Sequence, residues 1–141
     1  MEKKIELYFN IGPEYITNES SLQKQINNSG WGANSWFELA LFLPNKFKIN
    51  SHAEYKYQQK TQSFTQDFNR LIWNTDISRS FLKDESLKLT LSANDLLNQN
   101  TGFDRFANGN MFGQNSYTTI KRFFMFSLSY DLNQMGGGSK K

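Results

Sequence analysis

The chain has 141 residues and a net charge of +3, which is enough sequence for one domain at most. Aromatic residues make up 16% of it, a fraction that excludes a disordered chain. Cysteine is absent and histidine occurs once, so disulfides, thiolate nucleophiles and multi-histidine metal sites are excluded. Lys and Arg are dispersed without a basic block, and we therefore expect no nucleic-acid partner.

Apolar and polar side chains alternate with a period of two along most of the chain, which is the pattern of β-strands with two unlike faces. The pattern predicts six long strands, at about residues 4–17, 31–43, 47–57, 68–82, 87–95 and 117–132. The predicted fold class is all-β, an antiparallel up-and-down meander. Residues 134–141 are rich in Gly and Lys, and we expect a flexible polar tail there.

The connections between these segments alternate in length. Pro44–Lys46 and residues 83–86 are short turns, whereas the other three connections are long and rich in polar residues. Outer-membrane β-barrels have this asymmetry, with short periplasmic turns and long outer loops. The alternation therefore favours part of a transmembrane barrel.

The lengths of the segments agree with a membrane crossing. At about 3.4 Å per residue, the nine residues from Phe124 to Leu132 extend about 30 Å. A strand of that length, tilted by about 40°, covers nearly the whole apolar band of about 25 Å. Arg79 falls beside a short turn, where a charge on the lipid side costs only about 0–1 kcal/mol.

The alternation assigns side chains to two faces. The face expected to contact lipid carries Phe37, Leu39, Leu41, Leu71, Trp73, Ile77, Leu89, Leu91, Phe124, Phe126, Leu128 and Tyr130. The face expected to line the lumen carries Glu38, Lys48, His52, Glu54, Asn74, Asp76, Lys88, Ser127 and Asp131. A soluble β-sandwich or small β-barrel that binds an apolar ligand would show the same alternation and is the alternative. Strand length favours the membrane barrel, because strands of soluble proteins have about five or six residues.

The last third of the chain carries a family resemblance. The segment Leu87–Asn100 includes the run Asn-Asp-Leu-Leu-Asn-Gln-Asn, and an Asn/Gly-rich stretch separates it from the strand Arg122–Asn133. This arrangement resembles the C-terminal strands of TonB-dependent-receptor-like outer-membrane proteins of Bacteroidetes. The resemblance implies the C-terminal portion of the barrel wall of an uptake receptor in the bacterial outer membrane. It also implies an N-terminal plug, absent from this chain, and does not indicate a substrate.

The number of strands predicts that the chain is a segment of a longer protein. Bacterial single-chain barrels have eight strands or more, and an open sheet in lipid would leave two unpaired edges. We therefore expect its partners to be outer-membrane lipid and the remainder of its own barrel and plug.

No group of residues points to catalysis, a cofactor or a metal. His52 and Glu54 point the same way on the polar face. Because no nucleophile accompanies this imidazole–carboxylate pair, the simpler explanation is a solvated pair on a lumen wall. We therefore expect no enzyme activity and no cofactor. Four aromatic residues are expected at loop tips, where they are candidates for ligand contact: Trp31, Phe103, Phe106 and Phe112.

Overall fold

The structure, a computed structural model, describes residues 4–17, 29–82, 84–108 and 111–132. It contains eight strands and one short 3-10 helix, η1 (Pro44–Lys46). The strands are β1 (Ile5–Ile16), β2 (Gly30–Leu43), β3 (Phe47–Gln58), β4 (Phe68–Phe81), β5 (Leu87–Asn94), β6 (Phe103–Asn108), β7 (Met111–Ser116) and β8 (Phe123–Tyr130). No helix among these residues is long and apolar enough to cross a membrane.

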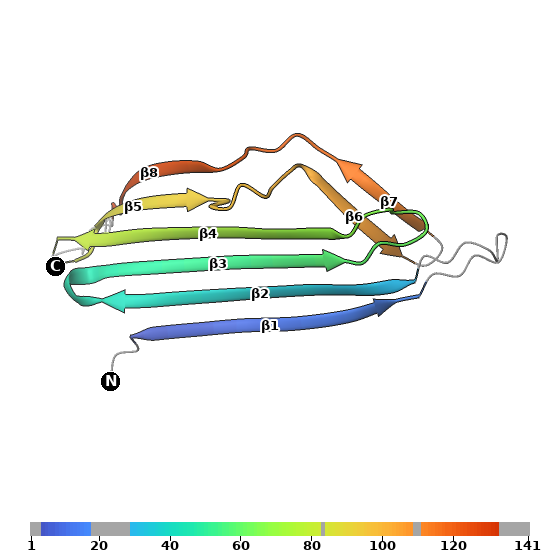
Figure 1. Ribbon diagram of the computed structural model, residues 1–141. Coiled ribbons are helices and arrows are strands. Elements are labelled where there is room, and N and C mark those ends of the chain that lie inside the picture. Colours follow the sequence, from blue (N-terminus) through green and yellow to red (C-terminus); the bar gives the residue numbers. More distant parts are fainter. Residues whose placement is uncertain (1–3, 18–28, 83, 109–110, 133–141) are drawn as a thin grey trace, which may run out of the picture.

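Six of the strands form one antiparallel sheet in the order β1-β2-β3-β4-β5-β8 (Figure 1). The predicted fold class, an antiparallel meander of about six long strands, is confirmed. The strands β2 and β4 each have 14 residues, whereas β5 and β8 each have eight. The sheet is therefore longer in the strand direction on the β1–β4 side than on the β5–β8 side.

The two ends of the sheet differ, as the connections predict. At one end, which we call the short-turn end, η1 joins β2 to β3, and residues 82–86 join β4 to β5. Asn45 and Lys46 both adopt positive φ angles in the tight turn after Pro44. The long connections lie at the opposite end, which we call the long-loop end (Figure 1).

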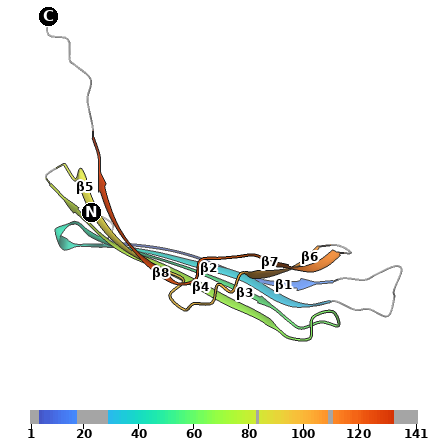
Figure 2. The same cartoon turned by 90° about the horizontal axis from the view of Figure 1, so that it is seen from above.

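The sheet is a single curved layer (Figure 2). Among the described residues, Phe68 is the only hydrophobic side chain that is buried, at 3% exposure. A β-sandwich would bury one face of each sheet in a common core. The described residues form no such core, so their large apolar side chains need an apolar environment from outside the described chain.

The structure corrects the prediction for residues 95–132 in two ways. The stretch expected as a loop contains a second sheet, the β6–β7 hairpin, with Phe103 opposite Ser116 and Asn108 opposite Met111. The last strand of the main sheet begins at Phe123 and not near residue 117, because its pairing with β5 ends at Asn94. Residues 117–122 pair with none of the strands in the described part of the chain.

Candidate functional site

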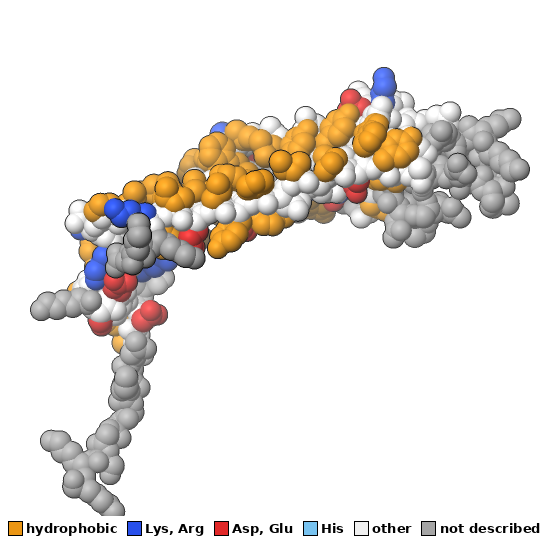
Figure 3. Space-filling view, turned by 90° about the horizontal axis from the view of Figure 1, so that it is seen from below, with side chains coloured by type: hydrophobic (Ala, Val, Ile, Leu, Met, Phe, Trp, Pro, Cys, Tyr) orange, Lys and Arg blue, Asp and Glu red, His pale blue; other side chains and the backbone are white. Residues whose placement is uncertain are grey.

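The apolar face is one continuous surface across six strands. The register places Phe37, Ala53 and Trp73 side by side, and it does the same for Ile77, Leu91 and Phe126. All twelve residues predicted to contact lipid lie on this face. The hydrophobic side chains form an almost continuous band along the molecule (Figure 3). Phe126 is 69% exposed and Leu128 is 64% exposed, values that are unusual for side chains of this size.

Polar atoms in the middle of the apolar face have partners within the sheet. The indole Nε1 of Trp73 donates a hydrogen bond of 2.8 Å to the hydroxyl of Ser51 on β3. The hydroxyl of Thr75 donates a hydrogen bond of 2.8 Å to the carbonyl oxygen of Asn50. An unpaired polar group in hydrocarbon costs several kcal/mol, so these bonds make the face compatible with an environment that lacks water.

Aromatic residues mark both ends of the apolar face. Tyr15 and Trp31 lie opposite each other at the long-loop end, with ring centroids 5.1 Å apart in an edge-to-face arrangement. Trp31 was expected at a loop tip, and this expectation is wrong, because β2 already begins at Gly30. At the short-turn end, the rings of Phe47 and Phe81 flank the Arg79 guanidinium. Such aromatic belts are typical of the two boundaries of a membrane.

The polar face carries the residues predicted to line a lumen, and several of them are paired. The register places Glu38, His52 and Asn74 side by side, and Asn50 donates a hydrogen bond of 2.9 Å to Asp76. Lys48, Glu54, Lys88 and Ser127 also belong to this face. Asp131 lies just beyond β8, where its backbone N–H donates to the carbonyl oxygen of Ser86.

His52 contacts two carboxylates. Its Nε2 lies 2.9 Å from Glu54 Oε1, as the spacing of the two residues predicts, and its Nδ1 lies 3.2 Å from Glu38 Oε1. A carboxylate accepts hydrogen bonds only, so both contacts are hydrogen bonds only when the imidazole is protonated on both nitrogens. The two contacts occupy both ring nitrogens of His52.

Two shallow cavities lie on the polar face and share Glu38 and His52. One has a volume of about 340 Å³ and extends across the sheet to Met125 of β8. The other has a volume of about 540 Å³ and reaches toward the long-loop end, where Trp36, Lys56 and Arg70 line it. In the described part of the chain, no three His, Asp or Glu residues are grouped so that they could hold a metal ion.

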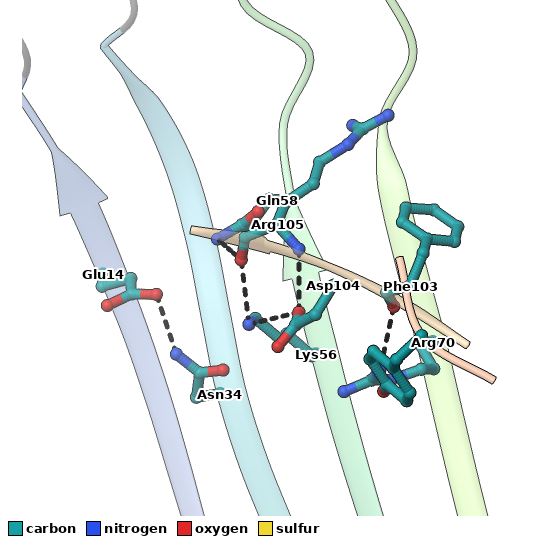
Figure 4. Close-up of polar contacts among 9 residues, drawn as sticks. Glu14, Asn34, Lys56, Gln58, Arg70, Phe103, Asp104 and Arg105 are labelled. Carbon is teal, nitrogen blue, oxygen red and sulfur yellow. Dashed lines mark hydrogen bonds and ion pairs between the residues drawn. The ribbon is translucent and has the colours of Figure 1, made fainter. Parts of the chain in front are cut away.

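The β6–β7 hairpin folds back onto the polar face at the long-loop end (Figures 2 and 4). The Lys56 ammonium forms a 2.7 Å ion pair with Asp104 and donates a 3.1 Å hydrogen bond to the carbonyl oxygen of Arg105. Arg70 donates a hydrogen bond of 3.1 Å to the carbonyl oxygen of Phe103. Side chains of β3 and β4 therefore hold the first three residues of β6.

Arg105 is the buried anchor of this hairpin. It is 9% exposed, and its guanidinium donates a 2.6 Å hydrogen bond to the carbonyl oxygen of Gln66. Its Cζ atom lies 4.6 Å from the centroid of the Phe64 ring and 5.8 Å from that of Phe68. Cation–π contacts are strongest when they are desolvated, as they are here.

The other predicted loop aromatics belong to the hairpin. The Phe103 ring packs edge-to-face on Phe68 at 5.1 Å, so it contributes to docking and is not free at a loop tip. Phe106 is 40% exposed and lies over Gly113, where a Cβ atom would come within 2.7 Å of its ring. Phe112 lies in β7, and its side chain is outside the described part of the structure.

A tight turn at Asp95–Asn100 connects the main sheet to the hairpin. The Asp95 carboxylate is 4% exposed and accepts hydrogen bonds of 2.9 and 3.0 Å from the backbone N–H groups of Gln99 and Asn100. The Gln99 side chain accepts a 2.8 Å hydrogen bond from the Leu71 N–H, and Leu96 N–H donates to the carbonyl oxygen of Trp73. The turn therefore provides hydrogen-bond partners for Leu71 and Trp73 in the part of β4 with which β5 no longer pairs.

Comparison with known proteins agrees with this geometry. Residues 1–130 match the model of a family described as an outer membrane protein beta-barrel family. Searches of curated proteins and of solved structures returned no match. The match covers most of the chain, and it accounts for a single-layered sheet of long strands whose apolar face is exposed. The chain belongs to the outer membrane protein β-barrel family and is therefore located in the outer membrane of bacteria.

Proposed function

We propose that this chain forms the C-terminal portion of the barrel wall of an outer-membrane uptake receptor of the TonB-dependent type. Its role is structural and contributes to substrate transport, without chemistry of its own. The apolar face carries the proposal, because it is continuous across six strands and largely exposed, and because the Trp73 indole and the Thr75 hydroxyl on it are hydrogen-bonded within the sheet. Lipid is the partner that such a face requires.

The polar face and the two sheet edges support a proposal for the remaining partners. In the described chain, β1 and β8 each pair with one neighbour only, so their outer edges carry unpaired backbone groups. We propose that strands from the remainder of the barrel complete these edges. The polar face then borders the lumen, and the plug or the transported substrate contacts the cavities beside Glu38 and His52.

Two observations support a receptor of this type. The segments Leu87–Asn100 and Arg122–Asn133 resemble the C-terminal strands of TonB-dependent-receptor-like proteins. The first of these segments contains the Asp95–Asn100 turn, which follows β5. The β6–β7 hairpin lies across the polar face at the long-loop end, and in the proposed barrel it would narrow the opening of the lumen. Loops that carry ligand contacts on a rigid scaffold are common at such positions.

The facing of the sheet is tested with its tryptophans, because Trp73 lies on the apolar face and Trp36 on the polar face. Two single-tryptophan variants are reconstituted in bilayers with brominated acyl chains: Trp31→Phe/Trp36→Phe keeps Trp73, and Trp31→Phe/Trp73→Phe keeps Trp36. Bromine quenches indole fluorescence on contact, so we expect quenching of Trp73 and little quenching of Trp36. Equal quenching of both, or none of Trp73 at any bromine depth, would overturn the proposal.

A further inference from the structure

Arg79 is unusual in its position. Among the described strand residues of the apolar face, it is the only charged one, and it lies directly between Phe47 on β3 and Leu89 on β5. The pair Phe81–Leu87 lies two residues closer to the short-turn end, and Leu87 also pairs with Tyr130. Arg79 is therefore close to the boundary of the apolar face, within reach of that boundary for a long and flexible side chain.

Two aromatic rings fix the direction of the Arg79 side chain. Its guanidinium carbon lies 4.9 Å from the centroid of Phe47 and 4.8 Å from that of Phe81. Both contacts use the π faces of the rings and leave the five N–H groups of the guanidinium in need of acceptors. The side chain is exposed, so these N–H groups face the surroundings of the sheet.

The two carboxylates of the connection between β4 and β5 contact other groups. Glu85 lies 3.3 Å from the Lys46 ammonium, and Asp84 accepts a hydrogen bond from the Ser86 hydroxyl. The ion pairs among the described residues involve Lys46, His52 and Lys56, and none involves Arg79. An anion from outside the sheet is therefore the matching partner for this guanidinium.

We propose that Arg79, held between Phe47 and Phe81, binds the phosphate group of a phospholipid in the leaflet that meets the short-turn end. The inference rests on the proposed function, which places this face in lipid. The planar guanidinium presents paired N–H groups that match two phosphate oxygens. Phe47, Phe81 and Tyr130 then lie at the level of the headgroups, as interfacial aromatic residues do.

The test is native mass spectrometry of the intact protein, released from detergent with added phosphatidylglycerol. The variant Arg79→Gln removes the charge, and Lys48→Gln is the matched control. Lys48 also lies over an aromatic ring, 5.0 Å from Phe42, at the same end of the sheet but on the polar face. We expect Arg79→Gln to reduce phosphatidylglycerol retention by roughly fivefold, the effect of one basic residue near a charged surface. Lys48→Gln should retain as much lipid as the wild type.

Retention by Arg79→Gln equal to that of the wild type would overturn the inference, and so would an equal loss in Lys48→Gln. The variant Arg79→Met keeps the apolar stem between the two rings and provides the same test if Arg79→Gln does not fold. Diacylglycerol with the same acyl chains measures retention without a phosphate, and equal retention of it by the wild type would also refute the site. Quenching of Trp73 by brominated lipid separates the two proposals, because it depends on the facing of the sheet and not on Arg79.

Discussion

Replacing Arg105 with Met should release the β6–β7 hairpin from the polar face. The substitution removes a charged hydrogen bond to the carbonyl oxygen of Gln66, worth about 1.5–3 kcal/mol, and a desolvated cation–π contact with Phe64, worth about 1–2 kcal/mol. Two effects offset this loss. The Arg105 Nε is buried without a partner, which already costs about 1–3 kcal/mol, and the Met side chain keeps some packing against the rings.

The net loss is about 2 kcal/mol, which corresponds to a roughly 30-fold increase in the open population of the hairpin. Hydrogen exchange followed by mass spectrometry measures this population, because amides exchange from locally open states. We expect faster exchange across 103–116 and unchanged exchange in β1 and β2. Arg79→Met is the control, since that arginine also contacts two phenylalanine rings but has no contact with the hairpin. Unchanged exchange of the hairpin in Arg105→Met would refute the role of Arg105 as its anchor.

Two further predictions concern the turns. Asp95→Ala removes the acceptor for two backbone N–H groups and puts Ala at a φ of 50°, so it should lower the unfolding free energy by about 2–4 kcal/mol in a urea titration. Asp95→Asn keeps one acceptor and should lose about half as much; a loss equal to that of Ala would contradict this explanation. The hydroxyl and then the backbone N–H of Ser86 lower the pKa of Asp84, so Asp84 contributes stability above its unfolded-state pKa and loses it as the pH falls through the lowered value. Ser86→Ala should raise the Asp84 pKa toward its ordinary value in an NMR titration, and an unchanged pKa would refute the assignment.

The strands and their faces were predictable from the sequence, because side-chain direction alternates locally along a strand. The contact between His52 and Glu54 follows from the same alternation, since the two residues are neighbours on one strand. The contact between His52 and Glu38 was not predictable, because it depends on the register between β2 and β3. Alternation alone fixes which face a residue occupies and leaves open which residue lies opposite.

The sequence contains one local indication of the hairpin, which the alternation of apolar residues does not reveal. Gly109 and Asn110 are the two residues between β6 and β7, and Gly-Asn is one of the dipeptides that indicate a two-residue hairpin turn. Its docking had no comparable signal. Arg105 is anchored by Phe64, Gln66 and Phe68, which lie about forty residues earlier in the chain and come together only when the sheet has formed.

The unequal strand lengths of the sheet explain the structural role of the Asn-Asp-Leu-Leu-Asn-Gln-Asn run. β5 pairs with β4 only from Thr75 to Phe81, so in the described chain the part of β4 nearer the long-loop end pairs with β3 on one side and with no strand on the other. The turn replaces a strand on that second side: Gln99 accepts the Leu71 N–H, Leu96 donates to Trp73, and Asp95 holds the turn closed. The same turn directs the chain toward the polar face, where β6 docks on Lys56 and Arg70. The run therefore determines where the sheet becomes shorter and where the hairpin starts.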